Sequence, residues 1–190
     1  QVAHPHDGGL PSDSDQPGAN FFFRAGSDGG RLLVDLRSAI EVWQINSYSW
    51  HRSTRAPQVY RVYVSDGKAA EFQAQPKRPL EPQQVGWKLL ASIDTRPDGK
   101  ANGGQYGVRI ADSKGASLGT LRYFLFDIQQ TESEDAFGNT FFSEIDVVDR
   151  NASEPAESGI VDAVQIDGTP FRFTIETTEA PDLTEWARTE

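Results

Sequence analysis

Residues 48–55 gather side chains that suit sugar binding. The segment contains Trp50, His51 and Arg52 and ends on Arg55. An aromatic ring offers a flat surface to the C–H face of a sugar, and guanidinium and imidazole groups donate hydrogen bonds to neighbouring hydroxyls. The segment lies between two apolar runs, so we expect a loop, and loops on rigid scaffolds often carry binding residues. In the alternative interpretation, Trp50 caps the core and Arg55 pairs with a carboxylate to hold the loop.

Three residues farther along the chain are predicted to complete the wall of the sugar-binding site: Tyr106, Phe137 and Asn139. The two aromatic rings add flat apolar surface, and the asparagine amide both donates and accepts hydrogen bonds.

Four acidic residues, three near the start of the chain and one late in it, are candidate ligands for a calcium ion. Asp7, Asp13 and Asp15 lie in a stretch rich in Gly and Pro, and Glu144 lies in a late apolar run. Carboxylates and backbone carbonyls are the hard oxygen ligands that Ca²⁺ prefers. The spacing is not that of an EF-hand, and the alternative is a solvated acidic loop.

Catalysis has little support in the sequence. There are three histidines and no cysteine, and the nucleophile-elbow, Walker and dinucleotide-binding patterns are absent. Glu132, Glu134 and Asp135 lie on one predicted loop, which favours a solvated acidic patch over two carboxyls facing each other across a cleft. His4 and His6 lie in an unpatterned segment, so we interpret them as part of a terminus. We therefore expect a binding module rather than an enzyme.

The charge argues against a nucleic-acid partner, because the 190 residues carry a formal net charge of −10. Most of it lies late in the chain, where residues 151–190 contribute −7. No apolar run approaches the roughly 20 residues that span a bilayer, so no transmembrane segment is expected. The chain begins with Gln1 rather than Met, which leaves open a removed signal peptide or an arbitrary boundary.

The candidate residues must be positioned by strands, because period-2 patterns dominate the chain. Short runs rich in β-branched and aromatic residues, bounded by Gly, Pro, Asn or Asp, predict strands. They cover residues 31–36, 40–48, 58–65, 87–93, 105–110, 121–128 and 140–148. The run 121–128 is apolar on both faces and predicts a central strand. Three prolines in residues 73–86 predict an exposed insertion between two strands.

The chain divides into four parts by composition. Residues 1–19 read as an irregular lead-in, and 20–150 as a β-sandwich. Residues 151–159 read as an acidic linker, and 160–190 as a hairpin and a short helix that belong to a following domain. A monomer within a larger multidomain protein is expected.

Four segments resemble the discoidin, or F5/8 type C, family when taken in order. Residues 31–36 resemble its LLVDL strand, and 55–67 (RAPQVYRVYVSDG) its segment ending in S-x-D-G, which a Trp follows at a distance, here Trp87. Residues 122–126 (RYFLF) and 143–147 (SEIDV) resemble its last two conserved strands. The long Pro-rich insertion and the lead-in depart from the family.

The discoidin resemblance implies an all-β, antiparallel jelly-roll β-sandwich of the galactose-binding-like type. It implies a non-catalytic carbohydrate-binding module of a secreted protein, in which loops at one end contact a cell-surface glycan or polysaccharide. Family members often hold a structural Ca²⁺, and the glutamate of their closing strand corresponds to Glu144.

The tail, residues 171–190, resembles the start of a basic secretory protein metallopeptidase domain of plants and bacteria, although the chain has no H-E-x-x-H motif. This leaves two alternatives to carbohydrate binding. The domain is either an N-terminal accessory of a secreted zinc metallopeptidase, or a structural or protein-interaction module without a sugar ligand.

Overall fold

The computed structural model describes residues 20–99, 103–134 and 138–151, and these residues form an all-β fold. The strands are β1 Gly29–His51, β2 Val59–Ser65, β3 Lys88–Asp94, β4 Gly104–Ala111, β5 Gly119–Gln129 and β6 Phe142–Asp149. Two short 3₁₀ turns, η1 Pro82–Val85 and η2 Pro97–Gly99, are the helical elements in these ranges. No helix among the described residues is long and apolar enough to cross a membrane.

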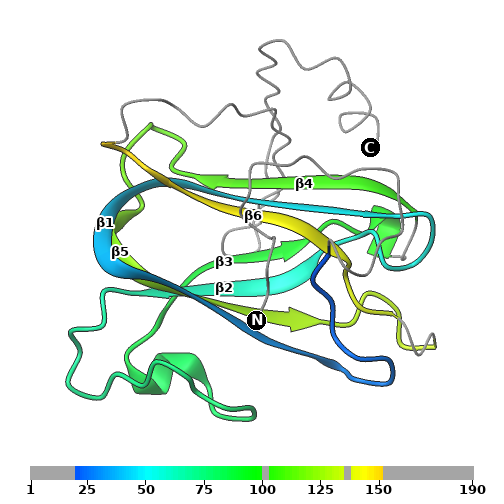
Figure 1. The fold of residues 1–190 in the computed structure, drawn as a ribbon, viewed down its shortest axis with the longest axis horizontal. Helices are drawn as coiled ribbons and strands as arrows, with labels where there is room; N and C mark the ends of the chain where they lie inside the picture. The colour runs from blue at the N-terminus through cyan, green and yellow to red at the C-terminus, as the bar shows by residue number, and fades with distance from the viewer. Residues whose placement is uncertain (1–19, 100–102, 135–137, 152–190) are drawn as a thin grey trace.

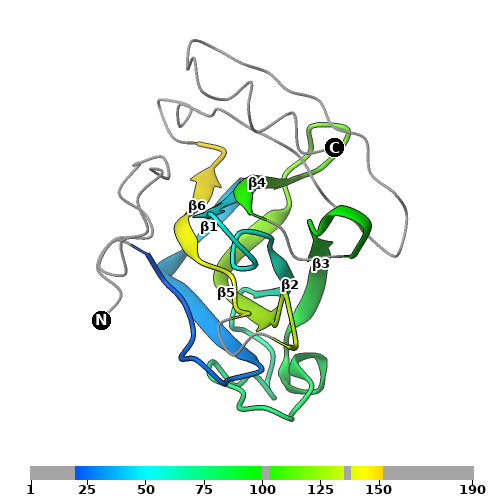
Figure 2. The same cartoon turned by 90° about the vertical axis from the view of Figure 1, so that its right-hand side faces the viewer.

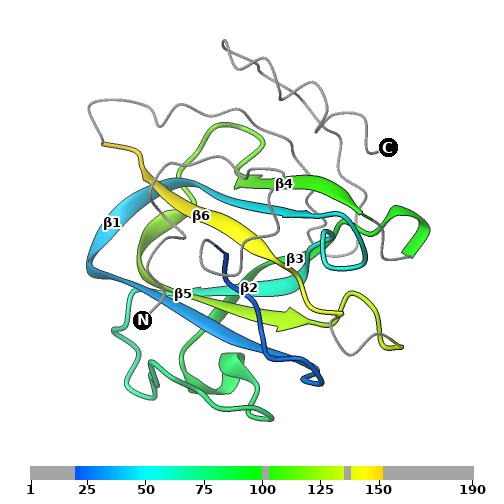
Figure 3. The ribbon, with the colours of Figure 1, turned by 45° about the vertical axis from the view of Figure 1, so that its right-hand side comes forward.

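One curled antiparallel sheet contains all six strands. Its order is β3-β2-β5-β1-β4, and β6 pairs with β1 as well. The first part of β1 pairs with β5, and the second part lies between β4 and β6. Strand β1 therefore belongs to both the β4–β1–β6 layer and the β5–β2–β3 layer, and it curves from one to the other in a half-barrel (Figures 1 and 3). The predicted all-β antiparallel class is confirmed.

The bend in β1 corrects one prediction. Two separate strands were predicted over residues 31–36 and 40–48, but the chain stays in the sheet and shifts register between Asp35 and Ile40. Arg37 takes the left-handed conformation with φ 70°, and its amide donates to the Asp35 carboxylate at 2.8 Å. A β-bulge of this kind bends a strand without ending it.

The main core fills the inside of the curl. Alternation directs Tyr60, Val62 and Val64 of β2 inward, together with Phe124 and Phe126 of β5. Both faces of β5 are buried, and it pairs with β1 and β2, so the predicted central strand is confirmed.

Gln58 joins the two layers through buried hydrogen bonds. It is fully buried at the start of β2, and its amide donates to the backbone carbonyls of Ser47 on β1 and Tyr106 on β4, both at 3.1 Å. The Ser47 hydroxyl lies 2.9 Å from the Tyr60 hydroxyl, and burial raises the pKa of Tyr60 above its usual value. These bonds satisfy polar groups that would otherwise be costly inside the core.

The Pro-rich insertion lies between β2 and β3, as predicted, but it is exposed only in part, because some of its residues pack on the sheet. It covers the outer face of the β5–β2–β3 layer, where Val85 and Trp87 form a second cluster with Tyr63 and Leu125 (lower left in Figure 1). The Trp87 indole donates to the Gln73 carbonyl at 2.8 Å. The insertion contributes its own apolar residues to this contact, which outweigh the local signal of its prolines.

Four connecting segments gather at one end of the sheet. Residues 20–28 precede β1, 52–58 join β1 to β2, 95–103 join β3 to β4, and 130–141 join β5 to β6. Figure 2 views the molecule from this side. We call the described parts of these segments the loop end.

Candidate functional site

The loop end is held together by hydrogen bonds between its segments. The Thr131 hydroxyl donates to the Thr54 carbonyl at 2.6 Å, and the Phe141 amide donates to the Arg55 carbonyl at 2.9 Å. The Gln130 side-chain amide donates to the Ser27 carbonyl at 3.1 Å. These bonds fix loops that are far apart in the sequence, so the side chains they present are positioned before any ligand binds.

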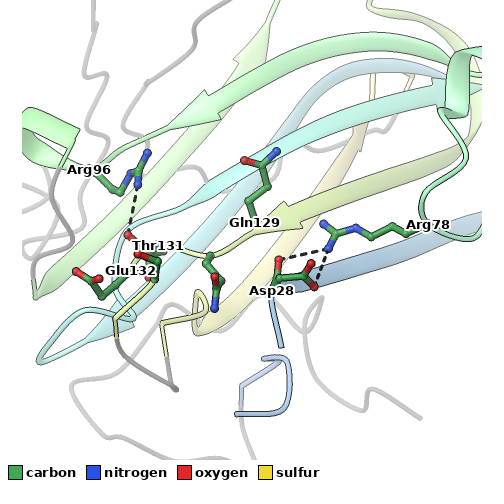
Figure 4. Close-up of a pocket in the computed structure, with 8 residues that line it drawn as sticks. Asp28, Arg78, Arg96, Gln129, Thr131 and Glu132 are labelled. Carbon is green, nitrogen blue, oxygen red and sulfur yellow. Dashed lines mark hydrogen bonds and ion pairs between the residues drawn. The ribbon is translucent and has the colours of Figure 1, made fainter. Parts of the chain in front are cut away.

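A polar groove of about 430 Å³ opens at the loop end (Figure 4). Every lining side chain is polar or charged: Asp28, Arg78, Arg96, Gln129, Gln130, Thr131, Glu132 and Ser133. They come from the segment before β1, the insertion, the segment after β3, and the end of β5 with its following loop. We call this hollow the loop-end groove.

Arg96 forms one wall of the loop-end groove. Its Nε donates to the Asp94 carboxylate at 2.9 Å, and a second nitrogen binds the other oxygen of that carboxylate. A third nitrogen donates to the Thr131 carbonyl at 3.4 Å. Its hydrogen bonds to Asp94 raise the pKa of Arg96 above its usual range. The guanidinium is fixed in a planar orientation, and its remaining N–H groups can donate to a ligand.

Arg78 forms the opposite wall and belongs to the insertion. Its Nε and one terminal nitrogen donate to the Asp127 carboxylate at 2.9 and 2.7 Å, and it also lies 3.4 Å from the Asp28 carboxylate. Arg31 reaches the other oxygen of Asp127 at 3.2 Å and donates to the Pro76 carbonyl at 2.9 Å. This network ties the insertion to the sheet beside the groove.

Gln129 lies between the two arginine walls, where its side chain is exposed. Within the described part of the chain, the side-chain amide of Gln129 makes no hydrogen bond. Glu132 accepts the Glu134 backbone amide at 2.8 Å, which leaves its second carboxylate oxygen as a further acceptor. The groove thus presents an amide, a carboxylate and a guanidinium that can all bind hydroxyl groups.

The predicted sugar-binding segment 48–55 is divided between a strand and a loop. Tyr48 to His51 belong to β1, so the prediction of a loop over that part is wrong. Trp50 is half-buried and pairs with Gln105 of β4, whereas Arg52 is exposed. None of the predicted residues of this segment lines the loop-end groove.

His51 and Arg55 contact the protein itself. His51 is buried, and its Nδ1 accepts the Ser53 backbone amide at 3.1 Å. The Arg55 guanidinium lies 4.7 Å from the ring centre of Phe22 and 4.6 Å from that of Phe141, while its Nε donates to a backbone carbonyl at 3.4 Å. Cation–π contact of this kind stabilises the loop, which agrees with a structural role for Arg55.

Of the other predicted wall residues, Tyr106 and Asn139 do not line the groove either. Tyr106 lies on β4 opposite Ser49 and is buried, and burial raises the pKa of its hydroxyl. Asn139 is fully buried, and its amide donates to the Ser27 carbonyl at 3.2 Å. Phe137 lies outside the described residues.

Only Glu144 of the four predicted calcium ligands lies within the described ranges, because Asp7, Asp13 and Asp15 fall outside them. Glu144 is buried on β6, opposite Tyr48. Across residues 20–99, 103–134 and 138–151, no group of three His, Cys, Asp or Glu side chains is placed to hold a metal ion. One carboxylate does not test the predicted site, so calcium stays a prediction.

Sequence reasoning missed Arg96 and Gln129, which lie in or next to strands without a local motif. The two residues lie close together in the fold because β2 pairs with both β3 and β5. Comparisons with protein-family models, with curated proteins and with solved structures found no match to this chain.

Proposed function

We propose that this chain is a non-catalytic carbohydrate-binding module of a secreted protein, with a jelly-roll β-sandwich of the discoidin type. The ligand binds in the loop-end groove rather than at residues 48–55. The observation that carries the proposal is the groove itself, which is lined by polar and charged side chains from four separate segments. Fixed polar groups that converge on a hollow can orient a ligand and give specificity.

The charge balance favours a neutral ligand. Arg96 is paired with Asp94, and Arg78 is paired with Asp127 and Asp28. A site for phosphate or sulfate needs cations whose charge is available to the anion. Here each guanidinium already neutralises a carboxylate, so hydroxyl groups of a neutral sugar fit the groove better than an anion.

The free hydrogen-bonding groups also fit a sugar. Each sugar hydroxyl both donates and accepts, and the groove offers donors on Arg96, acceptors on Glu132, and both on Gln129. Two adjacent hydroxyls can bind one planar amide or guanidinium group. The hydrogen bonds to charged partners contribute more affinity than neutral ones.

The carboxylates of the groove favour binding over hydrolysis. A glycosidase needs a general acid in an apolar setting that keeps it protonated. The Asp28 side chain is 89% exposed and lies beside Arg78. That setting suits a carboxylate that accepts hydrogen bonds from a ligand.

The test is binding of the purified chain to an array of neutral and anionic glycans, followed by calorimetric titration of the best ligand. We expect neutral glycans to bind, and Gln129→Ala to weaken them about tenfold, as loss of one or two hydrogen bonds predicts. Gln83→Ala is the matched control, because Gln83 is an exposed glutamine of the insertion outside the groove. Binding that is confined to anionic glycans, or equal for both variants, contradicts the proposal.

A further inference from the structure

The insertion leaves one part of the outer sheet face uncovered. Its apolar cluster lies over Tyr63 and Leu125, near the middle of β2 and β5. Toward the loop end, the same face presents Arg61 of β2, Ser92 of β3 and Gln129 of β5 instead. The covered part is apolar and the uncovered part is polar, which is the pattern expected where a surface stays open to solvent.

This uncovered part forms a second hollow of about 160 Å³. Strand pairing places its residues side by side, because Arg61 of β2 lies opposite Ser92 of β3 and opposite Asp127 of β5. Residues directly opposite in antiparallel strands present their side chains on the same face. We call this hollow the sheet-face hollow.

The two hollows share a boundary. Arg96 and Gln129 line both the loop-end groove and the sheet-face hollow. Arg96 is fixed by Asp94, which lines the sheet-face hollow, and by the Thr131 carbonyl on the loop-end side. A ligand in contact with Arg96 and Gln129 therefore reaches both hollows without any change in the protein.

The Arg78–Asp127–Arg31 network limits the ligand's path. It holds the insertion to the sheet through the Arg78–Asp127 bonds at 2.7 and 2.9 Å and the Arg31–Pro76 bond at 2.9 Å. Because Asp127 is the residue opposite Arg61, the network lies beside the sheet-face hollow. The insertion thus acts as a wall along an extended path, and the groove is not a closed pocket for one sugar ring.

We propose that the loop-end groove and the sheet-face hollow form one continuous site for an extended neutral oligosaccharide, with Arg61 and Ser92 contacting sugar units that the loop-end groove does not reach. The ligand class is a run of several units within a polysaccharide chain, not a single terminal sugar. This inference rests on the proposed carbohydrate binding and adds the length of the ligand.

The chemistry of the sheet-face hollow suits such an extension. Arg61 is exposed and offers a planar set of donors, and Ser92 adds a hydroxyl. The hollow's floor is formed by the strands themselves, since Tyr60 and Ile93 are buried on their inner face, and Val59, on the same face as Arg61, is buried as well. The site is thus built on rigid strands, which limits the ordering cost of binding.

The experiment is calorimetric titration of the whole chain with cello-, malto-, xylo- and manno-oligosaccharides of one to six units. For the series that binds, we expect the dissociation constant to fall at least about tenfold between the shortest binding oligomer and the longest, since added units bring one or two further hydrogen bonds. The double variant Arg61→Ala, Ser92→Ala is expected to remove this gain and to leave binding of the shortest oligomer within about twofold.

Lys88→Ala is the matched control, because Lys88 is an exposed cation at the other end of β3 and lines neither hollow. Melting curves of the variants confirm that each is folded. A dissociation constant that does not change with oligomer length, or a length dependence that the double variant retains, overturns the inference while carbohydrate binding stands. If the folded chain binds no oligomer of any series, carbohydrate binding itself fails, and the inference fails with it.

Discussion

The guanidinium of Arg55 shows how a residue of the right chemical type can serve the protein itself. It contacts both the Phe22 and Phe141 rings, which stack on each other, and it binds a backbone carbonyl, so it is part of the loop's support. Arg52, three residues earlier, is exposed. Sequence reasoning named both, because residue type and loop position are visible in the sequence and the partner of each side chain is not.

Arg55→Ala is expected to lower the free energy of unfolding by about 1–3 kcal/mol, as loss of partly buried cation–π contacts and a hydrogen bond predicts. Arg52→Ala is expected to change it by less than about 0.5 kcal/mol, as for most exposed residues. Urea unfolding of the two variants measures the difference. If Arg52→Ala abolishes glycan binding while Arg55→Ala leaves the free energy of unfolding unchanged, residues 48–55 form the binding site. The structural role assigned to Arg55 is then wrong.

Gln129 and Arg96 could not have been identified as neighbours from the sequence. They are separated by the whole of β4 and most of β5, and no motif joins them. They meet because β5 pairs with β2 and β2 pairs with β3. Such pairing follows from packing of the whole core, which period-2 patterns do not specify.

At the scale of elements, alternation alone identified most of the strands. Strands β2 to β6 all lie within two residues of their predicted bounds, because each carries a recognisable pattern between clear turn residues. The bend of β1 was interpreted as a break because polar residues interrupt its pattern. The structure keeps the strand continuous through the contacts of the Asp35 carboxylate.

The bend of β1 makes stability depend on pH. The hydrogen bond from Arg122 and that from the Arg37 amide hold the pKa of Asp35 below its usual value of 3.8. A carboxyl with a lowered folded-state pKa stabilises the fold above its unfolded pKa, and the effect is lost as the pH falls through the folded value. Asp35→Asn is therefore expected to melt at a lower temperature than the wild type at pH 7.

The two melting temperatures should begin to converge once the pH falls below about 3.8, and they should meet below the lower folded-state pKa of Asp35, where the wild-type carboxyl is neutral in the folded protein as well. Melting temperatures of both proteins between pH 7 and pH 2 check this. A difference that stays constant over the whole range contradicts a role for the Asp35 charge in holding the bend.

The insertion is a packed element, and Trp87 at its end tests this. Trp87 is 4% exposed and contacts the Phe72 and Tyr123 rings at centroid distances of 5.3 and 6.3 Å. Trp87→Ala is expected to cost about 3–5 kcal/mol of unfolding free energy, as for other buried aromatic residues. Trp87→Phe keeps most of the packing and loses the bond to Gln73, so its cost should be about 1–3 kcal/mol.

Urea unfolding measures both Trp87 variants. A cost below about 1 kcal/mol for Trp87→Ala is what an exposed insertion predicts, and it is incompatible with the packing described here. The sequence predicted that Trp87 opens a strand over residues 87–93, whereas the prolines just before it favoured an exposed segment. Tertiary contact with Tyr63 and Leu125 decided the outcome.

At the scale of the whole molecule, the net charge of −10 says little about the candidate site. Most of that charge lies in residues 151–190, of which only Asn151 belongs to the described residues. Around the loop-end groove, both arginines lie in ion pairs with carboxylates. The composition argued against a nucleic-acid partner, but it did not predict these paired charges at the groove.

The calcium prediction also concerns the whole molecule, because a bound ion stabilises the entire fold by mass action. If Asp7, Asp13, Asp15 and Glu144 hold Ca²⁺ as predicted, EDTA should lower the melting temperature of the full chain, and excess Ca²⁺ should restore it. Mg²⁺ at the same concentration is the control, since it prefers smaller octahedral sites. Equal melting temperatures with and without EDTA contradict a structural calcium ion.

The central claim is that a neutral carbohydrate binds in the loop-end groove. Its most direct test is two-dimensional NMR of the isotopically labelled full chain, titrated with the best ligand of the glycan array. We predict that the largest amide shift changes cluster at residues 28, 96 and 129–133, around the groove. Changes that centre on residues 48–55 instead, or the absence of any change at saturating ligand, would contradict the account.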